Sequence, residues 1–240
     1  MDKAVTSSWI VARVIGPLAL AFFAACPASG APVPCPGDDG FAVEPGHSAL
    51  VPRLCEMAPP LRDAMTDCGL TQSRVLTVEV VAGLTKPFDT CLAHFDCRSD
   101  RIRIVDPASY PDLLIKDTVY SLLPDDVLLR ALLTHEMAHA LTFQASGDRE
   151  MDIVDLEYIA AAMELELMEP KWRDVLIEAA PVSLPPKEGL IDVWIYGMAP
   201  RKFAVNAWRH FSLPTNGCGL IRRMVEGEAS FSKAARPDLR

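Results

Sequence analysis

A long apolar segment from Pro124 to about Gln144 constrains this chain more than any other part of its sequence. Pro suits the first position of a helix, and the two acidic residues that follow favour the positive end of the helix dipole. The segment is apolar on nearly every side, so it predicts a helix buried inside a domain. It nevertheless contains His135, Glu136 and His139, and buried ionisable groups are costly unless something compensates them.

The spacing of these three residues predicts that a zinc ion is the compensating group. In the sequence HEMAH, the two histidines stand at positions i and i+4 of a helix, so both imidazoles can reach one ion. Glu136 would then lie beside a zinc-bound water and could accept its proton. The alternative reading is a pair of core histidines with local hydrogen bonds and no metal.

A third ligand has to come from another segment, and two glutamates of a second helix, expected at 152–168, are candidates. On a helical wheel of 100° per residue, Glu157 and Glu164 both fall at the edge of the apolar face. They stand about 10.5 Å apart along the helix axis, so only one can meet a single ion. Symmetry about the turn near residues 146–149 places Glu157 level with His139, which favours Glu157 as the ligand. Glu164 would then orient a histidine or, as we slightly prefer, be a plain carboxylate at the edge of the core.

A family resemblance follows from these residues. A helix with HExxH and a second helix that offers Glu157 after 17 intervening residues resembles the gluzincin branch of the zincin metallopeptidases. The resemblance covers residues 124–168. It implies an α+β, zincin-like fold, in which a small antiparallel or mixed sheet lies over a buried active-site helix and the C-terminal part is mainly helical.

The same resemblance implies a function. We expect an exported zinc-dependent metallopeptidase that hydrolyses peptide bonds with a zinc-activated water and with Glu136 as the general base. The alternative is a zincin-fold envelope binding protein whose zinc site is structural or vestigial and which has no peptidase activity. A structural site has no need of a carboxylate at position 136, and this point favours the enzyme.

Gluzincins usually also place a Tyr or a His near the zinc, where it stabilises the oxyanion. His210 is the first candidate for this catalytic role, with Tyr196 and Tyr158 behind it. The alternative for His210 is an ordinary histidine on a helix face. His94, on an expected strand, is a further residue that could line the cleft.

The rest of the chain predicts a single catalytic domain at 49–230. Three strands, at 75–81, 91–95 and 101–105, are expected to form a small antiparallel sheet. Further helices are expected at 49–67, 171–178, 200–211 and 219–224, the first of them interrupted or bent at Pro59-Pro60. A Pro/Gly-rich loop or extended arm at 31–48 would precede the domain, and a flexible tail at 231–240 would follow it.

The first 30 residues have the pattern of a secretory signal peptide. Lys3 and Arg13 precede an apolar stretch at 14–25, and small residues follow up to Gly30, after which we expect cleavage. The stretch is too short for a membrane helix, which needs about 20 residues, so no stable transmembrane span is expected after processing. The mature protein would be secreted or periplasmic. Alternatively, it would be a lipoprotein anchored through Cys26.

The six cysteines outside the signal peptide agree with export, because an even number in an oxidising compartment suggests three disulfides. The spacing suggests the pairs Cys91–Cys97, Cys55–Cys68 and Cys35–Cys218, although sequence leaves the connectivity open. Buried free thiols are the alternative.

The net charge of −9 and the absence of any basic run argue against a nucleic-acid partner. The expected partner is a peptide or protein substrate. The sequence leaves the oligomeric state open.

Overall fold

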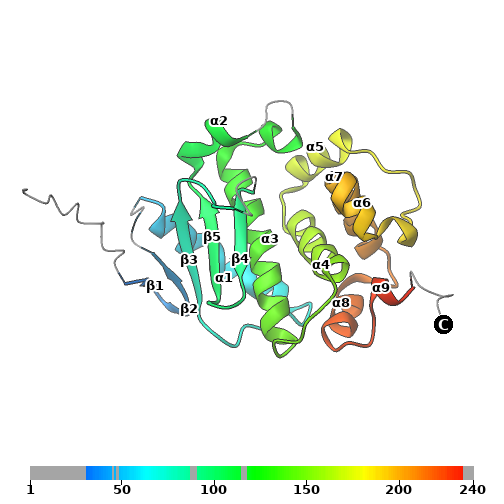
Figure 1. Cartoon of the computed structure of the whole chain (residues 1–240), viewed down its shortest axis with the longest axis horizontal. Helices are drawn as coiled ribbons and strands as arrows, with labels where there is room; N and C mark the ends of the chain where they lie inside the picture. The colour runs from blue at the N-terminus through cyan, green and yellow to red at the C-terminus, as the bar shows by residue number, and fades with distance from the viewer. Residues whose placement is uncertain (1–30, 45, 47–48, 87–90, 115–117, 235–240) are drawn as a thin grey trace, which may run out of the picture.

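The computed structural model describes residues 31–44, 46, 49–86, 91–114 and 118–234 (Figure 1). The expected signal peptide, Cys26 and the tail residues 235–240 lie outside the described residues. Within them the protein is an α+β structure, with a small mixed sheet on one side and a group of helices on the other. This coarse architecture agrees with the fold class expected from the sequence.

The sheet has five strands in the order β1-β2-β3-β5-β4. Their bounds are β1 (Val33–Cys35), β2 (Asp38–Val43), β3 (Leu76–Val81), β4 (Ala93–Asp96) and β5 (Arg101–Val105). The three strands expected from the sequence are present, but their expected antiparallel arrangement is wrong for one pair. Strand β3 runs parallel to both β2 and β5, whereas β4 forms an antiparallel hairpin with β5 and lies at the edge of the sheet.

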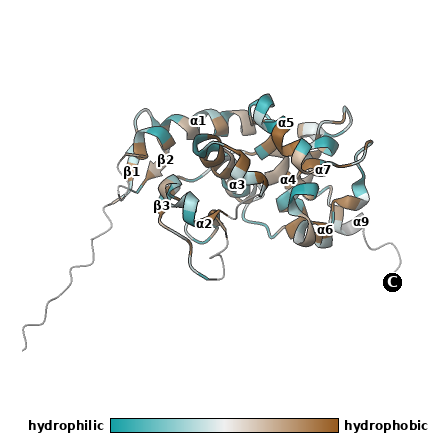
Figure 2. Cartoon of the chain, turned by 90° about the horizontal axis from the view of Figure 1, so that it is seen from above, coloured by the Kyte–Doolittle hydropathy of each residue, from teal (hydrophilic) through white to brown (hydrophobic). Residues whose placement is uncertain are grey.

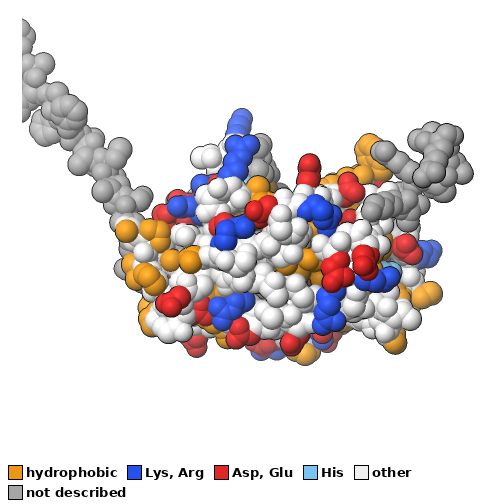
Figure 3. All heavy atoms as spheres, turned by 90° about the horizontal axis from the view of Figure 1, so that it is seen from below, with side chains coloured by type: hydrophobic (Ala, Val, Ile, Leu, Met, Phe, Trp, Pro, Cys, Tyr) orange, Lys and Arg blue, Asp and Glu red, His pale blue; other side chains and the backbone are white. Residues whose placement is uncertain are grey.

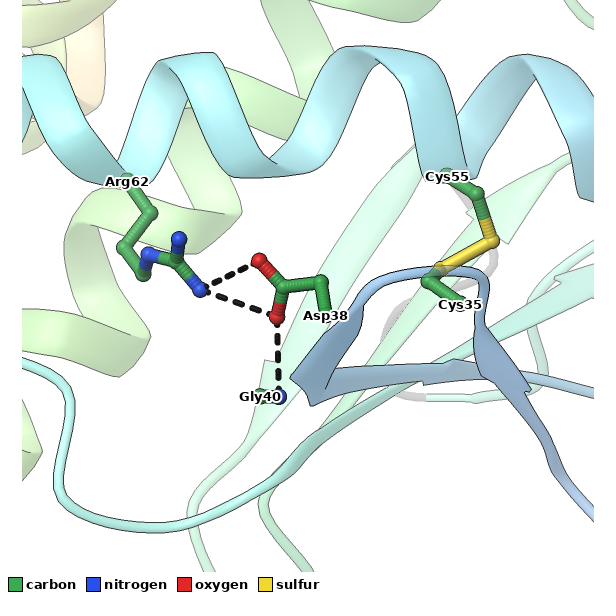
Figure 4. The surroundings of a disulfide bond; sticks show 5 residues. All are labelled: Cys35, Asp38, Gly40, Cys55 and Arg62. Atoms are coloured by element: carbon green, nitrogen blue, oxygen red, sulfur yellow. Dashed lines mark hydrogen bonds and ion pairs between the residues drawn. A yellow bond between two sulfur atoms is a disulfide. The ribbon is translucent and has the colours of Figure 1, made fainter.

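The segment at 31–48, expected as a loop or arm, instead supplies β1 and β2 to the sheet. Phe41 and Val43 of β2 are buried in the core. Two cross-links tie this hairpin to the first helix, α1 (Val51–Thr66): the Cys35–Cys55 disulfide and the ion pair between Arg62 and Asp38 (Figure 4). The Gly and Pro residues of the segment favour loops, so its sequence did not predict strands. Pairing of β2 with β3 and packing on α1 stabilise the two strands in the folded protein.

The sheet is apolar on one face only. Along β3 and β5, alternate residues are buried, and the residues between them are partly exposed. The partly exposed face carries a ladder of ion pairs in which Arg101 contacts Glu44 and Glu79, and Arg103 contacts Glu79 at 3.0 Å. The alternation in the sequence predicted this division between a core face and a solvent face.

Helices cover the core face of the sheet and then extend away from it. After α1, the helices are α2 (Tyr110–Leu113), α3 (Asp125–Ala145), α4 (Ile153–Glu166), α5 (Pro170–Ala179), α6 (Val193–Met198), α7 (Pro200–Phe211), α8 (Gly217–Val225) and α9 (Phe231–Ala234). Helix α1 packs on β2, and α3 packs on β4 and β5; α4 contacts α3 and α7 (Figure 1). Helix α3 therefore lies in the middle of the molecule, and Figure 2 shows its hydrophobic residues there.

Of the two alternatives expected at Pro59-Pro60, an interruption or a bend, the interruption is absent, because helix α1 runs through both prolines as one element. Its buried residues are Leu54, Ala58, Leu61 and Met65. They recur at intervals of three or four and thus form one apolar stripe, whose packing outweighs the backbone hydrogen bonds lost at the prolines.

The turn between α3 and α4 brings the two helices side by side. Gly147 and Asp148 both have positive φ, a conformation that favours glycine and tolerates Asp. Gln144 near the end of α3 accepts hydrogen bonds from the backbone of Ser73 and Arg74, which fixes this end against the sheet side. On α4, three consecutive alanines, 160–162, are buried and allow close approach of its neighbours.

The segment at 231–240, expected as a flexible tail, begins with an ordered helix. Phe231 is 8 % exposed, and its ring packs against the rings of Tyr158 and His210. Its backbone N–H donates to the buried carboxylate of Asp155. One aromatic side chain in a polar segment gave too weak a signal for this docking to be expected.

The disulfides are Cys35–Cys55 and Cys68–Cys218, so the expected pairs Cys55–Cys68 and Cys35–Cys218 are wrong. The expected Cys91–Cys97 bond is also not formed. Strand β4 lies between these two cysteines and alone spans about 10 Å, more than the Cα separation of about 4.4–6.8 Å that a disulfide permits. Two disulfides are compatible with an extracellular or periplasmic protein.

Within the described part of the chain, no helix has the length and apolar character that a membrane crossing requires. On the face shown in Figure 3, basic and acidic side chains are interspersed and form no basic patch.

We expect peptide mapping without reduction to find Cys35–Cys55 and Cys68–Cys218.

Cys68→Ala/Cys218→Ala should lower the free energy of unfolding more than Cys35→Ala/Cys55→Ala, because the Cys68–Cys218 cross-link spans 150 residues, whereas the Cys35–Cys55 cross-link spans 20. Loop entropy gives about 5 and about 3 kcal/mol respectively. Urea unfolding measures both values, and the opposite order would contradict the argument from loop length.

Candidate metal centre

Helix α3 presents two histidines on the side that faces α4. His135 and His139 lie one helical turn apart, and their Nε2 atoms are 3.2 Å from each other. Their rings meet edge to face. Two ring nitrogens at this separation need a proton or a cation to relieve the repulsion between their lone pairs.

Glu157 of α4 completes a three-residue cluster with these histidines. Its Oε2 lies 3.5 Å from Nε2 of His135, and its Oε1 lies 3.5 Å from Nε2 of His139. Zinc bonds of about 2.0–2.1 Å in a tetrahedron place neighbouring donor atoms about 3.3–3.4 Å apart. The Nε2–Nε2 separation is close to one edge of such a tetrahedron, and each imidazole faces its own oxygen of Glu157. One donor atom from each of the three residues lies within 4.8 Å of the other two, so the residues fit a zinc ion.

Glu164, two turns further along α4, lies behind His135 rather than in the cluster. Its Oε2 is 2.9 Å from Nδ1 of His135, and its side chain is only 3 % exposed. This contact places the proton of a neutral His135 on Nδ1 and turns the lone pair of Nε2 toward Glu157. The preferred expectation for Glu164, a plain carboxylate at the edge of the core, is wrong; the carboxylate orients a histidine.

The charges of the cluster attract a cation. Burial acts to lower the pKa of His135, but hydrogen bonds to Glu157 and Glu164 raise it well above the usual range. For Glu157, burial favours the neutral form, but its contacts with the two histidines outweigh burial and lower its pKa strongly. The site is thus a buried, negatively charged position that favours either a proton or a metal ion.

Three further polar residues, Glu136, His94 and Tyr196, lie near the cluster. Glu136 is 8 % exposed, and its charge acts on both His94 of β4 and Tyr196 of α6. Burial raises the pKa of Tyr196, as do the charge of Glu157 and a hydrogen bond to it. Burial also lowers the pKa of His94. A carboxylate, an imidazole and a neutral phenol therefore converge beside the candidate ligands.

His210, the first candidate for the oxyanion role, is engaged in another contact. Its Nδ1 and the Tyr158 hydroxyl form a hydrogen bond at 3.0 Å, and its ring packs on Phe231. Asn216 donates to its backbone carbonyl. The cluster of potential metal ligands does not include His210. The sequence could not distinguish it from Tyr196, because α6 is a six-residue helix that the periodicity did not reveal.

Sequence reasoning also missed Tyr120 and Arg201, which lie behind Glu164. The Tyr120 hydroxyl donates to Oε1 of Glu164 at 3.0 Å, and the Arg201 guanidinium lies over the Tyr120 ring at 3.3 Å from its centroid. Neither residue belongs to a local motif, so no sequence signal could have assigned them to the site.

The environment of His210 predicts a pH effect on stability. Burial lowers its pKa below the usual value, against a weaker opposing effect of Glu188, so the folded state favours neutral His210. The contribution of neutral His210 to stability is complete above the unfolded pKa of about 6.5 and is lost as the pH falls through the folded pKa. We expect the free energy of unfolding to fall more between pH 7 and pH 5 in the wild type than in His210→Gln. Urea unfolding at both pH values checks this, and equal pH slopes would contradict it.

Comparison with known proteins gives a family but no activity. No curated protein and no solved structure matches the chain. Residues 41–234 match a family of unknown function, DUF6639, and this match runs from within β2 to α9, including α3 and α4, which carry the candidate ligands. The chain is therefore a member of the DUF6639 family.

Proposed function

We propose that this protein is an exported zinc-dependent peptidase with a zincin-like arrangement of its active site. One observation carries the proposal: donor atoms of His135, His139 and Glu157, on two packed helices, lie within 4.8 Å of one another, with both imidazoles facing the same carboxylate. The HExxH motif, the downstream glutamate and the position of α3 against a small sheet support the same proposal.

Zinc at this site would polarise a substrate carbonyl and acidify a bound water, which is the chemistry that a peptidase requires. Glu136 is the general base: it follows His135 directly and lies near the cluster, where it can accept a proton and pass it to the leaving amine.

Tyr196 is the second catalytic group of the proposal, in the role first expected of His210. Its hydroxyl reaches Glu157 from α6, and its raised pKa keeps it a hydrogen-bond donor at neutral pH. A donor at this place can stabilise the negative charge that develops on the carbonyl oxygen.

Strand β4 offers a place for an extended substrate. It is an edge strand that packs against α3, and the charge of Glu136 acts to raise the pKa of its residue His94. A peptide that paired with this edge would run past the metal centre, with main-chain hydrogen bonds supplying affinity. A polypeptide is therefore the substrate class that the site fits best.

The alternative is a binding protein with a structural zinc. A structural site is a closed set of four protein ligands, whereas the cluster in the described residues has three. The carboxylate of Glu136 and the hydroxyl of Tyr196 near the cluster favour the enzyme.

We expect the mature protein to hold one zinc per chain after loading at neutral pH and dialysis. His135→Ala, His139→Ala and Glu157→Ala should each remove it, because a tetrahedral site cannot spare one of three protein ligands. Glu164→Gln should weaken binding by about 10–100-fold, as is usual for groups that orient a ligand. Elemental analysis and competition with a chelator measure both effects. A wild-type protein without zinc would refute the metal site.

We further expect Glu136→Gln to retain zinc and lose peptide hydrolysis, because only the proton acceptor is removed. Tyr196→Phe should also retain zinc and lower kcat by about 10²–10³-fold, the usual effect of one lost oxyanion donor. Tyr158→Phe is the matched control, since it removes another buried hydroxyl from the same region, and its kcat should equal that of the wild type.

A digest of a peptide library by the zinc-loaded mature protein supplies the substrate for these measurements. If the wild type binds zinc and cuts no peptide, the binding-protein alternative is correct.

A further inference from the structure

Two residues outside the metal cluster converge on Glu164 from different segments. Tyr120 belongs to a 3₁₀ turn, Val119–Leu122, that precedes α3, and Arg201 lies in the first turn of α7. Tyr120 donates to Oε1 of Glu164 at 3.0 Å, while Oε2 of the same carboxylate contacts Nδ1 of His135 at 2.9 Å. The Arg201 guanidinium lies on the Tyr120 ring and donates a hydrogen bond to its hydroxyl.

We propose that Arg201 and Tyr120 are positioning residues that act through Glu164 to hold His135 in the geometry that binds the metal ion. This inference rests on the proposed zinc site and adds to it a support made by segments outside the HExxH helix and its partner helix.

The first argument is geometric. A carboxylate held at one oxygen can rotate about its terminal bond, whereas one held at both oxygens has a fixed plane. Glu164 is held at both, by His135 and by Tyr120. Because its side chain is 3 % exposed, water has little access to replace a lost donor. Loss of the Tyr120 hydroxyl therefore leaves a buried oxygen unsatisfied and frees the carboxylate that orients His135.

The second argument is electrostatic. The carboxylate of Glu164 is near enough to the Arg201 guanidinium to raise the pKa of Arg201. Tyr120 stands between the two charges. With a divalent ion in the cluster, its two charges and that of Arg201 balance the three carboxylates Glu136, Glu157 and Glu164. Arg201 thus compensates the buried charge of Glu164 without occupying the histidine side of its carboxylate.

The third argument concerns the chain. Arg201 of α7 follows Tyr196 of α6 by only five residues, and the Tyr196 ring packs on the ring of Phe203, which also belongs to α7. The α6–α7 segment therefore supplies one side chain that reaches the metal centre at Glu157 and another to the support behind it. Correct docking of this segment on α4 assembles both at once.

Competition with a chelator tests the proposal on the full mature chain with zinc as the probe. Tyr120→Phe and Arg201→Met should each weaken zinc binding by about 10–100-fold. Arg201→Lys should recover part of the loss, because it restores the charge but not the planar stack.

Tyr158→Phe and Arg209→Met are the matched controls. The first removes a buried tyrosine hydroxyl that contacts a histidine, and the second removes an α7 arginine that donates to the Val182 carbonyl. Both should bind zinc within about twofold of the wild type, since neither residue contacts Glu164. Thermal unfolding of each variant establishes that it is folded.

A metal-independent signal separates this inference from the proposed function. In the metal-free protein, the Nδ1 proton of His135 should give a slowly exchanging NMR resonance, assigned by its loss in His135→Ala. We expect the resonance to persist in Tyr158→Phe and to broaden beyond detection in Tyr120→Phe.

Absence of zinc from the wild type would refute the proposed function, and the NMR signal would still decide the role of Tyr120. If folded Tyr120→Phe keeps both the resonance and wild-type zinc affinity, the positioning role is refuted, whatever Arg201→Met does.

Discussion

The structure depends on the burial of ionisable groups between α3 and α4. Two imidazoles and two carboxylates lie at this helix interface, and each carboxylate contacts His135. Buried charges are tolerated only when they are paired and hydrogen-bonded. The pairing therefore sets the register of the two helices: a shift of one turn would separate Glu157 from the histidines and leave several charges uncompensated.

Other features of the fold keep this interface rigid. The sheet supports α3 from one side through its apolar face, and α7 supports α4 from the other. The Cys68–Cys218 disulfide joins the end of α1 to α8, so the sheet half and the helical half are covalently linked. Such a frame supports the two helices that carry His135, His139 and Glu157, which is the kind of support that a metal site of defined geometry needs.

The proposed zinc site divides into a reactive side and a supporting side. We assign Glu136, His94 and Tyr196 to the first, because their charges and hydrogen bonds act on one another and on Glu157 and His139. Glu164, Tyr120 and Arg201 lie on the second, buried behind His135. Both sides draw on the α6–α7 segment, so we infer that metal affinity and oxyanion stabilisation depend on the same packing of the C-terminal helices.

The sequence by itself determined the elements whose signals are local. Alternation predicted β3, β4 and β5, and helical periodicity predicted α3 and α4. The spacing also predicted the two histidines at i and i+4 and the level of Glu157, because one helical turn fixes these relations. Only the tertiary structure decided the parallel pairing of β3 and β5, the strands at 33–43, the disulfide partners, the place of Tyr196 instead of His210 beside the cluster, and the contacts of Tyr120 and Arg201. These depend on which distant segments pack together, and long-range packing leaves no periodic trace in the chain.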